Sequence, residues 1–545
     1  NKSFKPFEKD QFTVYLPAWD MKPEEYTRFN KKINALQLLK QYWDEVLANA
    51  THIEIPDTFL ADVIRASQVH CLLAARNEQG GKRVAPWIAS ASYGPLESEA
   101  NAVIRGMDLL GHEEFARRSL DYFLARYNEE GYLTTGYTIV GTGWNLWTLA
   151  EHYERARDDE WLRSVAPIIA KACDWIVRQR AKTQLVDSRG EKIPEYGLVP
   201  PGVLADWNRY AYRFMYEGHF CAGLREAAKA LKIFGHPEAE RFQKEADAFR
   251  EDIRNAYRWN QQQSPVLCLK NGAWVPAYPG MLYCFGRIED IIPGEDWNRT
   301  WAYDVELGAH HLAALGVLDP ESNEVGQMLD HMEDFWFLHS GMGDYPAEKN
   351  QTDWFNLGGF AKVQPYYARS TELYALRDDV KPFIRSYFNA IFSLLNLETL
   401  SFWEHFHNIG AWNKTHETGA FLAQTRLLFV MERHDDLWLA PFAPTEWLAD
   451  GKSINVENAP TRFGKTSFAI HSHLAKNLIN VSISPPERIK PDHIVIRLRH
   501  PEGNAIEHVS AEGVENCIVD KEKQCVRVTP KGRPIRLSVY FSKTP

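Results

Sequence analysis

Residues 161–177 read WLRSVAPIIAKACDWIV, and this stretch decides the predicted fold class. Its apolar residues recur every three or four positions, which gathers them into one stripe along an α-helix. The sequence therefore predicts about twelve amphipathic helices between residues 57 and 435, where strand-like alternation is nearly absent. The same period marks the other helices at residues 57–76, 97–109, 113–127, 141–155, 211–233, 236–258, 301–316, 322–339, 361–377, 380–397 and 414–433.

The connections between these helices alternate in length. Short turns follow the helices that end near residues 110, 156, 233 and 377. Long loops inside a compact domain are usually functional. Helix pairs with short turns on one side and long loops on the other predict a closed ring whose long loops meet at one face. The long connections, rich in glycine, proline and aromatic residues, are 77–96, 183–210, 259–300, 340–360 and 398–413.

After about residue 455 the apolar period changes from helical spacing to strict alternation. Residues 467–472, 478–483, 493–498, 525–529 and 535–540 alternate apolar and polar side chains and are separated by turn residues. This pattern is typical of strands with one buried face. We therefore expect a mainly α protein that ends in a small antiparallel β-sandwich.

This organisation predicts three parts. Residues 1–50 form an N-terminal segment and linker helix, residues 51–438 form the catalytic domain, and residues 439–545 form a linker and the β-sandwich. The opening residues 12–16 have a strand-like pattern, as if they end an upstream domain. Because the chain starts without methionine, we expect that it was trimmed or cut from a longer precursor.

The composition limits the classes of partner. The 545 residues are 45% hydrophobic and 25% charged, with a net charge of −10. This excess of acid argues against nucleic acid and anionic membrane surfaces as partners, and no apolar run reaches the roughly 18 residues of a membrane span. Aromatic residues make up 13% of the chain, and aromatic faces stack on the C–H patches of sugar rings. We therefore expect a carbohydrate substrate.

The sequence predicts no metal and no cofactor. Its seven cysteines are scattered, without a CxxC pair or zinc-type spacing. It also lacks a GxxxxGK(S/T) phosphate loop, an HExxH motif, a GxSxG elbow and a GxGxxG segment after a strand. These absences argue against zinc, nucleotide and redox-cofactor chemistry.

The strongest cluster of candidate catalytic residues is Phe402-Trp-Glu-His-Phe-His-Asn, followed by Gly410-Ala-Trp-Asn-Lys-Thr-His-Glu-Thr-Gly. Glu404 stands between an aromatic residue and His405, and poor hydration raises the pKa of such a carboxyl toward a catalytically useful value. Trp412 offers a face for stacking, and His416 can donate or accept a hydrogen bond. A capping or ion-paired glutamate is the alternative interpretation.

Two further segments offer a second carboxylate. In Leu204-Ala-Asp-Trp-Asn-Arg-Tyr, Asp206 precedes Trp207 at the expected entry to a helix, where an aspartate is also a common N-cap. In Ser92-Tyr-Gly-Pro-Leu-Glu-Ser-Glu, Glu97 and Glu99 fall in a first helical turn, which favours acids through the helix dipole alone. Further residues expected to line sugar subsites are Trp144, Trp207, Asp344, Trp354, Gln364 and Tyr367.

Two carboxylic acids suit the cleavage of a glycosidic bond. One acid protonates the leaving oxygen, and a second carboxylate activates water or attacks the sugar directly. The separation of the two carboxyls distinguishes these mechanisms, at roughly 6.5–9.5 Å for inversion and about 5–5.5 Å for retention.

These features resemble the (α/α)6-barrel glycoside hydrolases. Residues 57–435 resemble the group of bacterial α-L-rhamnosidases, trehalases, glucoamylases and debranching-type α-glucosidases. Thr399-Leu-Ser-Phe-Trp-Glu-His-Phe is similar to the rhamnosidase segment Thr-Thr-x-Trp-Glu-Arg-Trp, in which the glutamate is the general base of an inverting reaction. The resemblance implies an (α/α)6 toroid followed by the β-sandwich, with Glu404 as the base.

The same resemblance offers two positions for the acid. Asp206-Trp-Asn-Arg-Tyr is similar to the trehalase and α-glucosidase segment Asp-x-Ser-x-Arg-Trp, whose aspartate is the general acid. Rhamnosidases place their acid earlier, in a segment matched in position by residues 92–99, which here lack the usual Asp and Arg partners. The resemblance therefore implies Asp206 as the acid, with Glu97 as the reserve. These families often carry an N-terminal β-sandwich, so an upstream β-domain or a second chain from the same precursor is an expected partner.

Two other functions remain open on the sequence. A polysaccharide lyase would act by β-elimination on a uronic-acid-containing glycan, with a tyrosine or histidine base and a group that neutralises the uronate. The residues available for this chemistry are Tyr367, His405, His407 and Asn408. A non-catalytic glycan-binding protein is the other alternative, and it predicts that one of the two carboxylates points away from the pocket.

Overall fold

The computed structural model describes residues 34–133, 138–204, 207–285, 308–335, 366, 369–404, 410 and 412–542, with a few residues before 26. Contacts divide the chain into two units, Asn1–Asn49 and Ala50–Pro545. In the first unit, helix α2 (Ala35–Leu47) begins where the Asn34 side chain accepts a hydrogen bond from the Gln37 amide. The strand-like stretch at residues 12–16 lies outside the described residues.

The second unit confirms the helices that the apolar period predicts. Aspartates begin two of them, because Asp57 and Asp158 each accept a hydrogen bond from an amide of the first turn. Within the described residues, no helix combines the length and apolar character that crossing a membrane requires. The helices are α3 (Thr58–Ala74), α4 (Glu99–Leu109), α5 (Glu113–Leu124), α6 (Gly141–Ala156), α7 (Asp159–Ala181), α8 (Phe214–Ile233), α9 (Ala239–Gln263), α12 (Ala309–Ala314), α13 (Asn323–Phe335), α15 (Ser370–Arg377), α16 (Val380–Leu394) and α17 (Thr415–Phe429).

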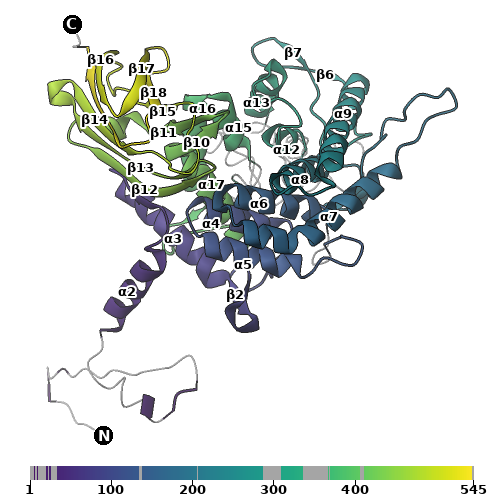
Figure 1. The fold of residues 1–545 in the computed structure, drawn as a ribbon, viewed down its shortest axis with the longest axis horizontal. Coiled ribbons are helices and arrows are strands. Elements are labelled where there is room, and N and C mark those ends of the chain that lie inside the picture. The colour runs from purple at the N-terminus through teal and green to yellow at the C-terminus, as the bar shows by residue number, and fades with distance from the viewer. Residues whose placement is uncertain are drawn as a thin grey trace. The chain divides into compact units, whose positions relative to one another are not determined.

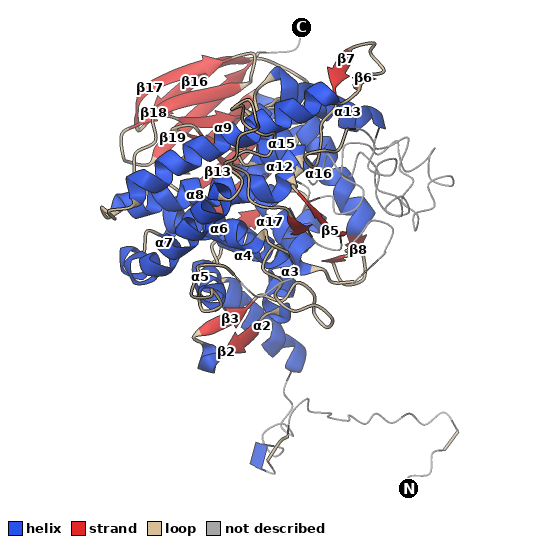
Figure 2. Ribbon diagram, turned by 90° about the vertical axis from the view of Figure 1, so that its right-hand side faces the viewer, coloured by secondary structure: helices blue, strands red, loops and turns tan. Residues whose placement is uncertain are grey.

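Two helix pairs, α4 with α17 and α6 with α8, approach closely enough for their backbones to touch. A Cβ atom on Gly106 of α4 would lie 2.0 Å from the Gly419 carbonyl oxygen of α17. Likewise, a Cβ atom on Gly143 of α6 would lie 2.6 Å from the Phe220 Cα atom of α8. Figure 2 shows α6 and α8 adjacent in the helical part. Glycine is therefore a packing requirement at both crossings.

The strand-rich part contains two sheets, and all their strands except β1 come from the C-terminal part, coloured green to yellow in Figure 1. Their orders are β1-β12-β13-β14-β19-β16 and β10-β11-β15-β18-β17. Alternation decides which face is buried: Phe468 and Ile470 of β13 are buried, while Lys465 and His471 are exposed. The strands are β1 (His52–Glu54), β10 (Val430–Arg433), β11 (Asp436–Leu439), β12 (Ser453–Thr461), β13 (Gly464–His473), β14 (Leu478–Ser484), β15 (Ile494–Arg497), β16 (Ile506–Glu512), β17 (Val514–Asp520), β18 (Cys525–Pro530) and β19 (Ile535–Phe541).

Two expectations for this region need correction. The β11–β15 pair is parallel, whereas the expected sandwich is antiparallel. The chain leaves β11 to form β12–β14 in the other sheet and then returns, and a long excursion of this kind permits parallel pairing. The strands also begin earlier than expected, because α17 ends at Phe429 and β10 and β11 form a hairpin with His434 at φ 51°.

The predicted linker after residue 439 is packed against the helices. Phe442 lies 4.3 Å from Phe383 of α16, and Trp447 stacks on Phe429 of α17 at 6.0 Å, measured between ring centroids. Phe442 and Trp447 are both buried. The apolar core therefore continues from the helices into the strand-rich part.

Candidate active site

Two segments far apart in the sequence lie side by side at the entries to α4 and α17. The Thr415 amide donates to the Ile88 carbonyl at 2.8 Å, and the Thr415 hydroxyl donates to the Trp87 carbonyl at 2.6 Å. Ala89 and Lys414 form an isolated β-bridge between the same segments. These contacts bring two clusters of predicted site residues together, one around Glu404 and the other just before α4.

Glu404 is held by a buried lysine. Its side chain is 15% exposed, and its Oε1 atom accepts a hydrogen bond from Lys414 Nζ at 2.7 Å. The Lys414 side chain is only 2% exposed, and Nζ lies 3.8 Å from the ring centroid of Tyr93. An ammonium group at this distance stabilises an ionised carboxylate. This pairing suits a base, and it also suits a structural ion pair.

Gly410 lies against the Glu404 side chain. Gly410 has φ +85°, and a Cβ atom there would lie 2.7 Å from Glu404 Oε2. Only glycine satisfies both the left-handed backbone and this close approach. Trp412, two residues later, is 44% exposed, so one aromatic side chain near Glu404 is available for stacking.

The second group of acids lies at the entries to α4 and α6. Glu97 is buried, and its Oε1 atom accepts a hydrogen bond from the Thr138 amide at 3.4 Å. A Cβ atom on Gly141 would lie 1.9 Å from Glu97 Cγ, so this carboxylate is packed under the start of α6. The positive end of a helix dipole favours an anion at this place.

Glu99 was not among the predicted catalytic residues, yet the structure places it beside the same site. Its side chain is 14% exposed, and its Oε1 atom lies 3.9 Å from Nδ1 of His416. In sequence, an acid in the first turn of a helix is indistinguishable from one placed there by the dipole. Only the approach of α17 to α4 shows its position.

The predicted sugar contacts within the described residues differ in exposure. His416 is buried, with Nε2 3.8 Å from Glu417 Oε1, so its position favours orienting neighbouring acids over touching a sugar. Trp144 is also buried and stacks on His219 with ring centroids 4.0 Å apart. Of the three predicted contacts that the structure describes, Trp412 alone keeps a large exposed surface.

A group of buried histidines, which the sequence did not single out, includes His219 and His311, whose ring centroids lie 5.2 Å apart. Burial lowers the pKa of His219 and of His310 to about 3, and burial also lowers the pKa of the adjacent His311. Nearby, burial raises the pKa of Glu217, whose Oε2 atom accepts a hydrogen bond from the Val199 amide at 3.1 Å. The three histidines are therefore neutral at pH 7. Histidines on apolar helix faces are usually part of a core, so the sequence carried no functional signal.

Several predicted residues cannot be placed. The side chains of Asp206, Trp207, Asp344, Trp354, Gln364, Tyr367 and His405 lie outside the described residues, as do His407 and Asn408. The strands that flank residue 206, β4 (Gly202–Leu204) and β5 (Trp207–Ala211), pair with each other. Across the described ranges, no group of three or more histidine, cysteine, aspartate or glutamate side chains could hold a metal ion.

No protein-family model and no curated protein matches the sequence. Among solved structures, the chain is similar to the α-L-rhamnosidase from Dictyoglumus thermophilum, with 12% identity and a TM-score of 0.50, over 90% of this chain and 50% of that one. It is also similar to the GH78 family rhamnosidase of Bacillus sp. GL1, with 11% identity and a TM-score of 0.50, over 84% of this chain and 43% of that one. The chain thus spans about half the length of these rhamnosidases. At this identity the likeness shows the fold alone, and the chain therefore has the fold of these glycosidases.

Proposed function

We propose that the protein is a glycoside hydrolase that cleaves a glycosidic bond in an oligo- or polysaccharide with two carboxylic acids and inverts the anomeric carbon. The observation that carries the proposal is the contact between residues 87–90 and 413–415. It gathers Glu404, Glu97 and Glu99 at the entries to α4, α6 and α17. The shared fold supports the reaction class. We also propose that the helices close into an (α/α)6 toroid and that the two C-terminal sheets pack as a sandwich.

In this mechanism Glu404 is the base. The Lys414 ammonium keeps its carboxylate ionised, so that it can accept a proton from a water molecule. The water oxygen attacks the anomeric carbon while the bond to the leaving oxygen breaks. A second carboxylic acid on the opposite side of the sugar protonates that oxygen. The exposed face of Trp412 stacks on the sugar ring.

The identity of the acid is the open part of this proposal. The resemblance to trehalase favours Asp206, whereas the contact of residues 87–90 with 413–415 favours Glu97 or Glu99. Glu99 keeps more exposure than the buried Glu97 and lies beside His416, so it is the better placed of the two to meet a leaving oxygen. All three are therefore tested together.

The test of the base is Glu404→Gln, measured on a panel of nitrophenyl glycosides that begins with the α-L-rhamnoside and on plant and bacterial polysaccharides. We expect a loss of about 3–5 kcal/mol in transition-state stabilisation, roughly 10²- to 10⁴-fold in kcat/KM, with unchanged folding. The matched control is Glu398→Gln, an exposed glutamate in the same loop. Undiminished turnover in Glu404→Gln would reject the assignment.

The acid is identified by leaving-group dependence. A variant that lacks the acid fails on natural glycosides, whose leaving oxygen needs a proton, but retains activity on nitrophenyl glycosides, whose leaving group needs none. Asp206→Asn, Glu97→Gln and Glu99→Gln are compared on both substrate classes. The anomer released first, followed by NMR, reports inversion. An unsaturated uronate product would instead identify a lyase and overturn the proposal.

A further inference from the structure

A charged cavity of about 400 Å³ lies toward the opposite ends of the same helices. Its walls come from the second halves of α4, α6 and α17, from α15 and residues 313–316, and from the strand-rich part. Helix α6 contacts both the acids and the cavity. Its first residue, Gly141, packs on Glu97, whereas Glu154 near its other end lines the cavity. At 1.5 Å per residue, these positions are roughly 20 Å apart along the helix axis. The cavity is therefore separate from the candidate active site.

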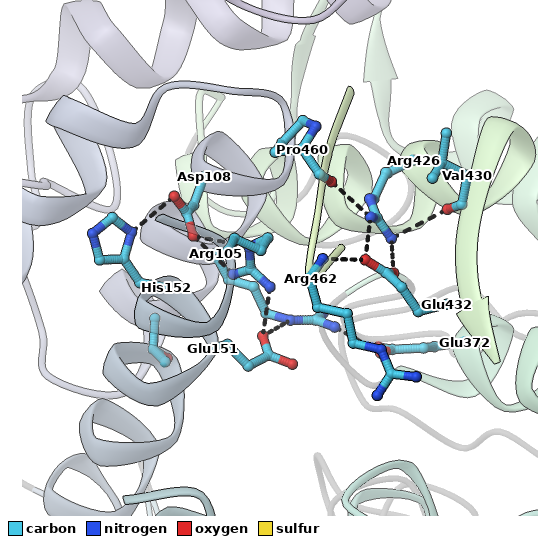
Figure 3. Close-up of polar contacts among 12 residues, drawn as sticks. Arg105, Asp108, Glu151, His152, Glu372, Arg426, Val430, Glu432, Pro460 and Arg462 are labelled. Atoms are coloured by element: carbon cyan, nitrogen blue, oxygen red, sulfur yellow. Dashed lines mark hydrogen bonds and ion pairs between the residues drawn. The ribbon is translucent and has the colours of Figure 1, made fainter. Parts of the chain in front are cut away.

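The described residues that line the cavity carry both charges in near balance, with six arginines and five glutamates. Figure 3 shows several of their pairs. Arg426 binds Glu432 through two hydrogen bonds of 2.6 and 2.8 Å, and Arg105 contacts Glu372 at 3.0 Å. Burial alone would raise the pKa of Glu372 and of Glu432, but the adjacent guanidinium groups lower both to about 2. Glu372 and Glu432 are thus ionised at neutral pH.

Some residues that line the cavity carry a buried polar atom without a hydrogen-bond partner among the described residues. The Arg369 side chain is 7% exposed, and its Nε and Nη2 atoms each contact Glu372 at 2.8 Å, but Nη1 has no hydrogen-bond acceptor. The Nε atoms of Arg426 and Arg462 are also buried and also have no hydrogen-bond acceptor among the described residues. Leaving a buried donor unsatisfied is unfavourable. The ion-pair network alone therefore leaves this wall incomplete.

An acid supplies the complementary group. Burial raises the pKa of Glu154, and the nearby Glu151 and Glu226 raise it further, against the effect of Arg462. Glu154 lines the same cavity as the unpartnered guanidinium nitrogens. The cavity therefore offers strong donors and an acceptor to whatever occupies it.

We propose that this cavity binds a neutral, polyhydroxylated small molecule of mono- or disaccharide size. An anion would meet five carboxylates, a cation would meet six guanidinium groups, and an apolar molecule would strip water from all of them. Hydroxyl groups accept from guanidinium N–H and donate to carboxylates at the same time. The volume falls within the range of small-molecule sites, roughly 300–1,000 Å³. This site does not depend on catalysis at Glu404.

The test fills the cavity and measures sugar binding to the full chain. Ala314→Phe places a large side chain at the wall, and Ala170→Phe is the matched control, a partly buried alanine of α7 away from the cavity. The probes in isothermal titration are D-glucose and L-rhamnose, with D-glucuronate and D-glucosamine as charged analogues. We expect a neutral sugar to bind the wild type and the control, and Ala314→Phe to lose one bound sugar or at least tenfold in affinity.

The outcomes separate this site from the proposed active site. The proposal is supported if Ala314→Phe no longer binds the neutral sugar and its glycoside turnover equals that of the wild type. It is equally supported if sugar binding is lost and no variant, including the wild type, shows turnover. Equal sugar binding by Ala314→Phe and Ala170→Phe shows a cavity filled by water alone and overturns the proposal. Selective loss of glucuronate or glucosamine overturns the ligand class. If Ala314→Phe fails to fold, Glu154→Leu replaces it, with Glu160→Leu at an exposed position as the control. Loss of neutral-sugar binding in Glu154→Leu alone supports the proposal, and equal binding by both variants overturns it.

Discussion

The two ends of the helical part hold their carboxylates in different ways. At the charged cavity, Glu372 and Glu432 are each gripped by arginine, and their pKa is lowered to about 2. At the candidate active site, Glu404 has one lysine contact, and Glu99 faces a buried histidine at 3.9 Å. Both ends are poorly exposed, so burial does not distinguish them. The partners do, because guanidinium groups lower the pKa of the two carboxyls at the cavity, whereas the partners at the candidate active site are a lysine and a histidine.

The largest change in stability is expected from Glu432→Gln, which tests the contrast between the two ends. The substitution leaves the buried Arg426 without its carboxylate and should cost about 3 kcal/mol of unfolding free energy. This is the low end for a buried pair because the Glu432 side chain keeps 19% exposure. Urea denaturation measures the loss, with the exposed Glu507→Gln as control. We expect kcat/KM to be unchanged in Glu432→Gln, whereas Glu404→Gln should lose kcat/KM and keep its stability. A Glu432→Gln variant with normal stability and a lower kcat/KM would contradict the assignment of Glu432 to stability.

Gly419→Ala tests whether the two ends depend on one helix crossing. A Cβ atom at Gly419 would lie 2.5 Å from the Ala102 carbonyl oxygen, so α17 must move away from α4. Overpacking of this kind costs about 2 kcal/mol and should also reduce turnover, because Lys414 and His416 move with α17. The control is Gly94→Ala, where a Cβ atom would meet nothing within 4 Å. Thermal melting and kinetics are measured together, and an undisturbed melting temperature would show that the crossing is not tight.

The buried neutral histidines predict a loss of stability in acid. His219 and His310 have a folded-state pKa of about 3, below the unfolded value of 6.5, so their stabilising effect is complete above pH 6.5 and is lost as the pH falls toward 3. Each contributes about 1.4 kcal/mol per pH unit in this window. The raised pKa of Glu217 acts in the opposite sense, but one carboxyl does not offset both histidines. Denaturation midpoints at pH 7, 6 and 5 check the slope, and His219→Gln should make it shallower.

The smallest expected effect comes from Lys414→Met, which leaves Glu404 without its ammonium contact. We expect about a tenfold loss of kcat/KM, about 1.4 kcal/mol, because the ionised base is no longer stabilised. The acidic limb of the pH–rate profile should move to higher pH, and Lys414→Arg should restore most of it. A merely structural role for Lys414 would lower stability and leave the profile in place.

Much of the helical part and the change to strands after residue 455 could be predicted from apolar period alone, because burial of one face dictates that period. Glu404 could be singled out as a candidate because its loop concentrates aromatic residues and histidines. The charged cavity could not be found. Arg105 and Glu372 are 267 residues apart, and each looks like an ordinary solvent-facing charge on its own helix. The parallel β11–β15 pair was missed for the same reason, since local alternation does not specify a strand's partner.

The bridge between residues 87–90 and 413–415 has a consequence for how the protein matures. Its two sides are separated by 328 positions, and loop closure over such a span delays formation of the contact relative to local helices. During synthesis the entry to α4 emerges long before α17. Glu97 and Glu99 therefore remain in a partly folded chain until α17 docks. Chains that stop short of α17 should therefore fold their early hairpins and still lack an assembled candidate active site.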